Sequence, residues 1–175
     1  MSNLKMLKNQ LQALNDKMAT DGIFATVVLI GGFAGRYLLS EYRQTLDIDF
    51  LVASINDEAN KASLWRSLLA ELDMEEVTIV EVPPVEEIEA QDKLDFGNLT
   101  VIIPTIEYFA ITKIFSDRQR DEDDLIHQKI LENCDPEKLQ QMIDLYMGDI
   151  LNPNNQNLNV HLLKDEFKKH GIKVN

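Results

Sequence analysis

Cysteine and long apolar runs are the scarcest features of this sequence. Cys134 is the single cysteine among 175 residues, so no internal disulfide can form, which fits a reducing cytosol. A membrane-spanning helix needs about 20 consecutive apolar residues, and no run approaches that length. The N-terminal segment also lacks the continuous apolar core of a signal peptide. We therefore expect a cytoplasmic protein that does not enter the membrane.

Basic residues are also few. The chain has 17 Lys and Arg against 30 Asp and Glu, which gives a formal net charge of -13. This balance argues against general affinity for nucleic acid phosphates, although it leaves room for a local basic patch. Hydrophobic residues make up 45%, enough to fill the core of one domain, or of a domain with a small appended helical part.

Strand-like patterns dominate the first part of the chain and helix-like patterns the second. Apolar and β-branched runs predict strands at 23–30, 45–52, 74–82 and 99–103. Apolar periodicity predicts helices at 3–19, 33–40, 59–72, 106–115, 121–133, 135–147 and 159–169. The fold class is therefore α/β (α+β), with a core at 1–104 and a helical part at 105–175 packed on it.

The stretch from Val27 to Val52 carries the residue types of a phosphate and metal site. The pair Gly31-Gly32 ends an apolar strand, allows a tight turn and lets the backbone approach an anion at the start of the next helix. Asp47 and Asp49 alternate with apolar residues, so in a strand their carboxylates share one face, roughly 6–7 Å apart. Such a pair can hold Mg²⁺ (or Mn²⁺), although either aspartate could instead lie on an exposed face or strand end.

These residues resemble a known signature. Ile30-Gly31-Gly32, followed after fourteen residues by Asp47-Ile48-Asp49-Phe50, looks like the motif of the nucleotidyltransferase superfamily, which has the DNA polymerase beta-like fold. The preceding Arg43-Gln44-Thr45 is similar to the AbiEii/AbiGii toxin-like branch and related uncharacterised bacterial proteins. The resemblance implies a mixed sheet flanked by helices, an NTP substrate and a tRNA or protein acceptor. It also implies an antitoxin partner, and a role for Arg43 and Thr45 in contacting phosphate or bracing the loop.

A second group of charged residues lies downstream. Lys113 follows Phe109 by four residues, which puts it on the apolar face of its helix. It either extends outward along that face or reaches into a cleft, where it would neutralise phosphate charge. The resemblance extends to Lys113 and the Arg120–Asp124 segment, and implies that Arg120, Asp121 and Asp124 help to bind nucleotide, the two aspartates by orienting Lys113 or an arginine. Alternatively, Asp121 caps the following helix.

A third carboxylate is the unassigned part of this hypothesis. Active members of the superfamily usually add one from a later strand, and the choice here lies between Glu81, which we favour, and Asp95. If neither serves, the chain could be a catalytically silent nucleotide-binding or regulatory module. A further alternative is a non-enzymatic interaction protein, in which Asp47 and Asp49 are incidental.

Overall fold

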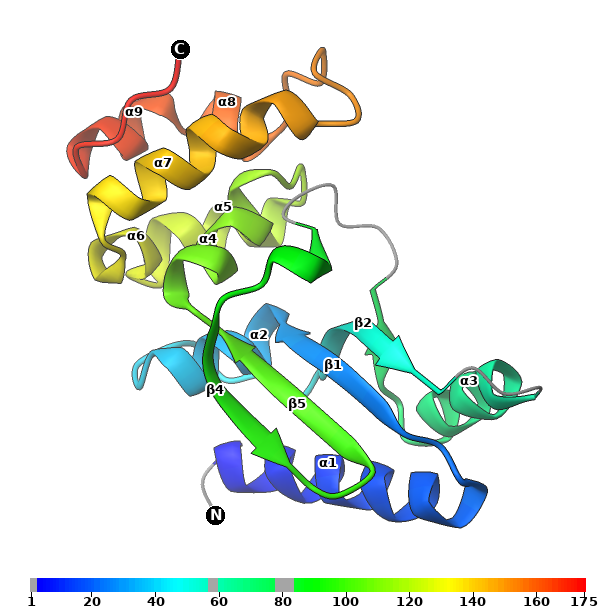
Figure 1. The fold of residues 1–175 in the computed structure, drawn as a ribbon. Coiled ribbons are helices and arrows are strands. Elements are labelled where there is room, and N and C mark those ends of the chain that lie inside the picture. Colours follow the sequence, from blue (N-terminus) through cyan, green and yellow to red (C-terminus); the bar gives the residue numbers. More distant parts are fainter. Residues whose placement is uncertain (1–2, 57–59, 78–83) are drawn as a thin grey trace. The chain divides into compact units, whose positions relative to one another are not determined.

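A computed structural model describes residues 3–56, 60–77 and 84–175 (Figure 1). The chain divides into two compact units. The first, here called the sheet unit, comprises Met1–Thr78 and Glu89–Pro104. The second, the helical unit, comprises Ile79–Ile88 and Thr105–Asn175. The described residues 84–88 therefore belong to the helical unit, although in the sequence they separate the two segments of the sheet unit.

The sheet unit is built on a mixed sheet of five strands in the described part of the chain. Its elements are α1 (Asn3–Asp21), β1 (Ala25–Ile30), α2 (Gly31–Leu38), β2 (Asp49–Ile55), α3 (Lys61–Glu71), β3 (Glu75–Glu76), β4 (Ala90–Asp95) and β5 (Leu99–Pro104). The strand order is β3-β2-β1-β5-β4. β1 pairs antiparallel with β2 and parallel with β5, while β3 runs parallel to β2 and β4 antiparallel to β5. This mixed α/β arrangement confirms the predicted fold class.

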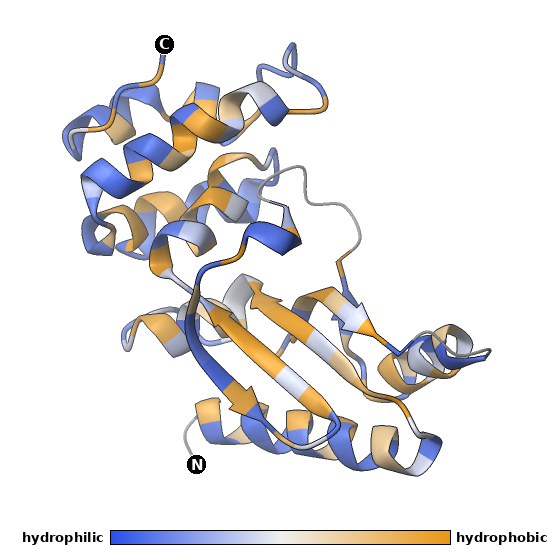
Figure 2. Ribbon diagram, viewed as in Figure 1, coloured by the Kyte–Doolittle hydropathy of each residue, from blue (hydrophilic) through white to orange (hydrophobic). Residues whose placement is uncertain are grey.

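The central strands are apolar because both of their faces are buried. β1 and β5 are nearly continuous in hydrophobic colour, whereas the edge strand β4 is mostly hydrophilic (Figure 2). β4 has the sequence AQDKLD and is exposed along almost its whole length. Charged side chains on an edge strand oppose pairing with other chains. Because its sequence is polar, β4 has no apolar run or alternation that would identify it as a strand, and it was not predicted.

Helices α1, α2 and α3 pack together in the sheet unit. α1 contacts α2, α3 and β5, and it lies along the sheet in Figure 1. Its predicted apolar stripe is buried, and Asn15 on the same face accepts hydrogen bonds from the backbone N–H groups of Asn98 and Leu99 at the start of β5. The ring of Phe50 on β2 lies 5.8 Å from that of Trp65 on α3. The helices and strands thereby share one apolar core.

The helical unit surrounds α4. Its elements are the 3-10 helix η1 (Val85–Glu87), α4 (Ile106–Ile114), α5 (Gln119–His127), α6 (Ile130–Asn133), α7 (Pro136–Tyr146), the 3-10 helix η2 (Met147–Asp149), α8 (Asn159–Leu162) and α9 (Lys164–Lys169). α4 contacts α5, α6, α7 and α8, and most of its side chains are buried. Asp135 caps α7 by accepting from the N–H groups of Glu137 and Lys138, as the Asp-Pro sequence predicts.

Several predicted boundaries need correction. The helix predicted at 121–133 is divided, since Lys129 adopts a left-handed backbone with φ 58° between α5 and α6. The helix predicted at 159–169 is likewise broken at Leu163. The strand predicted at 45–52 begins only at Asp49 and continues to Ile55. Of the strand predicted at 74–82, Glu75 and Glu76 form β3, and its later part falls among residues that the structure does not describe. Within the described residues, no helix combines the length and apolarity needed to cross a bilayer.

Candidate functional site

Gly31 and Asp49 meet at one end of the sheet. Ile30, the last residue of β1, pairs with Asp49, the first residue of β2. Gly31 then starts α2 with a left-handed φ of 68°. A Cβ atom at Gly31 would lie 2.6 Å from the Asp49 Oδ2 atom, closer than van der Waals contact allows. Glycine is therefore required here for both its backbone angle and its lack of a side chain.

Gly32 makes a similar close approach to Thr45. A Cβ atom at Gly32 would lie 2.8 Å from the Cβ atom of Thr45. Thr45 is buried, its carbonyl accepts from the Asn3 side chain at 2.9 Å, and its Oγ1 atom accepts from the N–H of Asp47 at 3.2 Å. The loop before β2 is thus held by side-chain contacts rather than by a strand ladder, which explains why β2 starts later than predicted.

Asp47 and Asp49 lie on either side of that strand start. Asp47 is exposed in the loop and Asp49 is half-buried, while Ile48 and Phe50 between and after them are buried. The predicted alternation of carboxylate and apolar side chains is therefore present, although only Asp49 belongs to the strand. The Asp49 carboxylate beside the glycine turn, with Asp47 two residues earlier in the chain, supplies oxygen donors, which suit a hard cation such as Mg²⁺. The observed residues fit that ion.

The third carboxylate stays unassigned. Glu81 lies outside the described residues. Asp95 pairs with Thr100, which pairs with Thr26, so it lies towards the end of the sheet opposite to Asp49. Its Oδ1 atom accepts from the N–H of Gly97 at 2.9 Å, which is a turn contact. Among the residues described, no group of three or more Asp, Glu, His or Cys side chains is arranged to hold a metal.

Arg43 lies in the same loop. Its guanidinium is 5.4 Å from the centre of the Tyr42 ring, a cation–π contact. Tyr42 in turn fills the space above Gly35, where a Cβ atom would lie 2.5 Å from the ring. Arg36 of α2 donates to the carbonyls of Ser40 and Tyr42. These contacts brace the loop against α2, and neither Gly35 nor Tyr42 carries a sequence signal that identifies this role.

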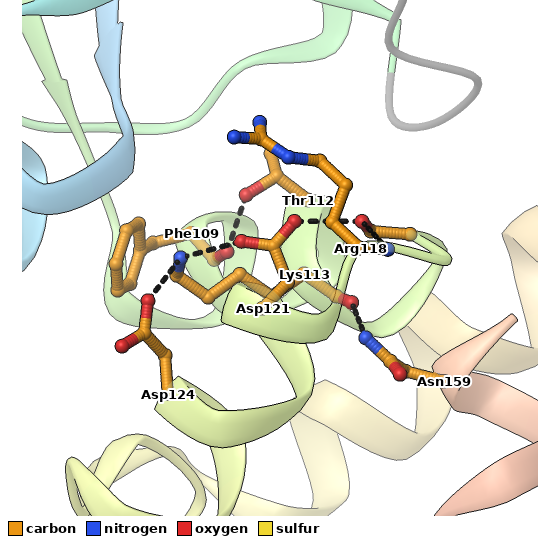
Figure 3. Close-up of polar contacts among 8 residues, drawn as sticks. Phe109, Thr112, Lys113, Arg118, Asp121, Asp124 and Asn159 are labelled. Carbon is orange, nitrogen blue, oxygen red and sulfur yellow. Dashed lines mark hydrogen bonds and ion pairs between the residues drawn. The ribbon is translucent and has the colours of Figure 1, made fainter.

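The second group of predicted residues gathers in the helical unit, around Lys113 (Figure 3). Lys113 is buried on the apolar face of α4, and its Nζ atom lies 2.9 Å from Asp121 Oδ1 and 3.0 Å from Asp124 Oδ2. The ammonium also lies 5.1 Å from the centre of the Phe109 ring. Its charge is therefore balanced within the protein by two carboxylates from α5.

Asp121 does not cap α5. That helix begins after Arg118, and Asp121 lies in its first turn, where its Oδ2 atom accepts from Ser116 Oγ at 2.6 Å. Asn159 of α8 donates from its side chain to the carbonyl of Lys113 at 2.9 Å, a contact between residues 46 positions apart. No sequence pattern identifies Ser116 and Asn159, because contacts between side chains and distant backbone leave no local signal.

A glycine turn beside the Asp49 carboxylate is an arrangement suited to binding the phosphates and the metal of a nucleotide. A comparison with protein families agrees with this interpretation. The family model described as "Nucleotidyltransferase of unknown function (DUF6036)" matches residues 2–170, nearly the whole chain. The chain belongs to this nucleotidyltransferase family. Searches of curated proteins and of solved structures returned no match.

Membership of this nucleotidyltransferase family confirms the superfamily resemblance. The match does not distinguish the AbiEii/AbiGii-like branch, which stays a prediction. The residues predicted for this nucleotidyltransferase fall into both units: the glycine turn, the loop and the two aspartates in the sheet unit, and Lys113, Arg120, Asp121 and Asp124 in the helical unit. Arg120 is exposed on the first turn of α5.

Proposed function

We propose that the chain binds a nucleoside triphosphate with a divalent metal and transfers the nucleoside monophosphate to an acceptor hydroxyl. The observation that carries the proposal is the contact between Gly31 and Asp49, because it joins an anion-approaching backbone turn to a metal-binding carboxylate in one place. The family description supports the same reaction class.

The glycine turn would receive the phosphates. α2 starts at Gly31 with no side chain capping its first turn, so its backbone N–H groups are oriented to meet an anion. Thr45 and Arg43 would fix or extend this surface from the loop. Asp47 and Asp49 would hold Mg²⁺ or Mn²⁺, which would supply charge neutralisation at the reacting phosphate.

The proposed reaction is a substitution at the α-phosphorus of the NTP. The acceptor oxygen forms a bond to the α-phosphorus, the bond from that phosphorus to the bridging oxygen breaks, and pyrophosphate leaves with that oxygen. The hydroxyl proton passes to solvent or to a carboxylate of the site. Glu81, the residue that we favour as third carboxylate, would accept that proton.

For the acceptor we propose the hydroxyl group of a tRNA or a protein. The AbiEii/AbiGii-like signature around Arg43 and Thr45 also favours a toxin of a toxin–antitoxin or phage-defence pair, with a protein antitoxin as partner and the cytoplasm as its place of action. Induction of the wild-type chain in a bacterial host would then slow growth, and induction of Asp49→Asn would not.

The test of transfer uses each α-³²P-labelled NTP in turn with Mg²⁺, and bulk tRNA and cell-extract protein as acceptors. Wild type should label one acceptor class, while Asp47→Asn and Asp49→Asn should lose the label while retaining the wild-type melting temperature. Binding of NTP without labelling of any acceptor would favour the silent nucleotide-binding module. Absence of both binding and labelling would contradict the proposal and favour an interaction protein.

A further inference from the structure

The loop between α2 and β2 carries Asp47 outside any regular element. Residues 39–48 form neither a helix nor a strand. Asp49 is placed by its pairing with Ile30 in the sheet, whereas the position of Asp47 depends on the contacts of the loop. A metal ligand serves best when its neighbours hold it in place before binding, because ordering a ligand on binding lowers affinity. The contacts that order this loop are therefore relevant to the metal site.

Thr45 joins Asp47 to the glycine turn. Its Oγ1 atom accepts from the backbone N–H of Asp47 at 3.2 Å, a local turn contact typical of threonine. Its Cβ atom would lie 2.8 Å from a Cβ atom at Gly32, so the residue packs directly on the start of α2. The backbone proposed to receive the phosphates and the backbone that carries Asp47 thus meet at Thr45.

Asn3 holds the same threonine from a different element. Its Nδ2 atom donates to the carbonyl of Thr45 at 2.9 Å, across 42 positions of the sequence. Asn3 is the first residue of α1, so the donor is carried by a helix and not by the loop itself. The contacts lead from α1 through Thr45 to the backbone of Asp47.

The helix that carries this donor is firmly placed in the sheet unit. Its apolar stripe is fully buried and consists of Leu7, Leu11, Leu14 and Met18. The Asn15 side chain accepts from the N–H groups of Asn98 and Leu99 at the start of β5. α1 is thus fixed to the sheet by its own core contacts. Asn3 therefore approaches the loop from a support whose position does not depend on the loop.

We propose that Asn3 is a positioning residue for the metal site. By holding the Thr45 carbonyl, it fixes the loop backbone so that the Asp47 carboxylate binds the metal of the nucleotide. This inference rests on the proposed function. It gives α1 a part in that function, although α1 carries none of the glycine and aspartate residues of the motif. All the contacts that support it lie within the sheet unit.

Metal-dependent nucleotide binding by the full chain tests the proposal without any transfer reaction. The probes are the α,β-methylene analogues of ATP, GTP, CTP and UTP, and their affinities are measured by equilibrium dialysis with and without Mn²⁺. The ratio of the two affinities measures how well the metal site works. Asn3→Ala should lower that ratio roughly fivefold, as expected for loss of one hydrogen bond, and leave the metal-free affinity unchanged. An unchanged ratio would overturn the proposal.

Three further substitutions on α1 separate positioning from general stability. Asn3→Asp keeps the shape of the side chain but removes the amide donor, so it should lower the ratio at least as much as Asn3→Ala. Gln12→Ala removes an exposed amide that bonds only to Asp16 of the same helix, and should change nothing. Asn15→Ala should lower the melting temperature and leave the ratio unchanged while the chain is folded. An equal loss in Asn15→Ala would overturn the specific role of Asn3.

A double-mutant cycle tests whether Asn3 acts through Asp47. Asp47→Asn should itself lower the metal-dependent ratio, because it removes the charge of a proposed ligand. If Asn3 acts by holding that ligand, Asn3→Ala should have no further effect in the Asp47→Asn background. Effects that add in full would overturn the positioning role, because they would show that Asn3 acts independently of Asp47.

The outcomes separate this inference from the proposed function. If the wild type binds none of the analogues with Mn²⁺, the proposed function fails and the inference fails with it. If the metal strengthens binding to the wild type and Asp47→Asn loses this gain while Asn3→Ala keeps it, only the inference fails. If Asp47→Asn keeps the gain, Asp47 is not a metal ligand, and both the inference and that part of the proposed function fail.

Discussion

Gly31, which directly follows β1, and Asp49, the first residue of β2, lie so close together that there is no room for a methyl group between them. The relationship is steric and reciprocal: the carboxylate can take this position only because residue 31 has no side chain. The position of the Asp49 carboxylate therefore depends on the glycine backbone of the turn.

Substitution of Gly31 by alanine should therefore be costly. The left-handed backbone and the 2.6 Å approach to Asp49 Oδ2 should together destabilise the fold by roughly 2–4 kcal/mol. Urea denaturation measures the change. Gly148→Ala is the matched control, because a Cβ there meets nothing within 4 Å, and its effect should stay within about 0.5 kcal/mol. In an Asp49→Ala background the cost of Gly31→Ala should fall, and an unchanged cost would contradict the steric explanation.

Removal of the Lys113 ammonium should destabilise the fold, because Asp121 and Asp124 would then be buried without a positive partner. Lys113→Met leaves Asp121 and Asp124 buried without a cation, so we expect a loss of about 3–5 kcal/mol in the free energy of unfolding. The double variant Lys113→Met/Asp124→Asn should recover part of that loss. Lys17→Met breaks the exposed 2.6 Å pair with Glu71 and should cost about 1 kcal/mol or less. Equal losses for the two lysine variants would contradict the burial seen here.

Cys134 should be unreactive in the folded protein. Burial, with Glu107 and Asp135 nearby, raises the pKa of its thiol well above the ordinary value of 9.0. The thiolate is the reactive form, so Ellman's reagent should modify the native chain at least roughly 10³-fold more slowly than the chain in guanidinium. Comparable rates in the two conditions would show that the thiol is accessible. The control is the unfolded chain, which should react with one equivalent.

The raised pKa of Tyr146 predicts a loss of stability at alkaline pH. Burial and the 2.7 Å hydrogen bond to Glu87 raise the pKa of Tyr146 to about 12, from an ordinary value of 10.0. Because the folded-state pKa is the higher one, this stabilisation is complete below the unfolded-state pKa and is lost as the pH rises through about 12. Urea midpoints of wild type and Tyr146→Phe should therefore differ at neutral pH and converge as the pH rises above 10.0. A constant difference across this range would contradict the coupling.

Local pattern predicted the central features of the fold. β1 and β5 are apolar because both faces are covered, and that composition is visible in the sequence alone. The glycine turn and the two aspartates are also recognisable in the sequence, because they stand beside apolar residues. Ile48 and Phe50, which are buried, alternate with Asp47 and Asp49. β4 was not predictable in this way, because its side chains are polar and exposed, and its existence depends on pairing with β5.

The details of the candidate site depend on contacts that sequence pattern does not encode. The start of β2 is delayed to Asp49 because Gly32 and Asn3 hold Thr45, and these contacts cross long stretches of chain. Helical spacing placed Lys113 on the apolar face of its helix, but its burial and its connection to Ser116 and Asn159 depend on the turn after α4 and on α8. Predictions from spacing therefore placed residues on faces, while side-chain partners emerged only from the fold.

The hydrogen bond from Asn3 to the Thr45 carbonyl has a practical consequence for experiments on this protein. It fixes the first residue of α1 against the loop that leads to Asp47. An affinity tag or fusion partner joined ahead of Asn3 would start beside that loop and obstruct access to it. Tags for the assays above belong at the C-terminal end, and an N-terminal tag should be cleaved before an inactive result is interpreted.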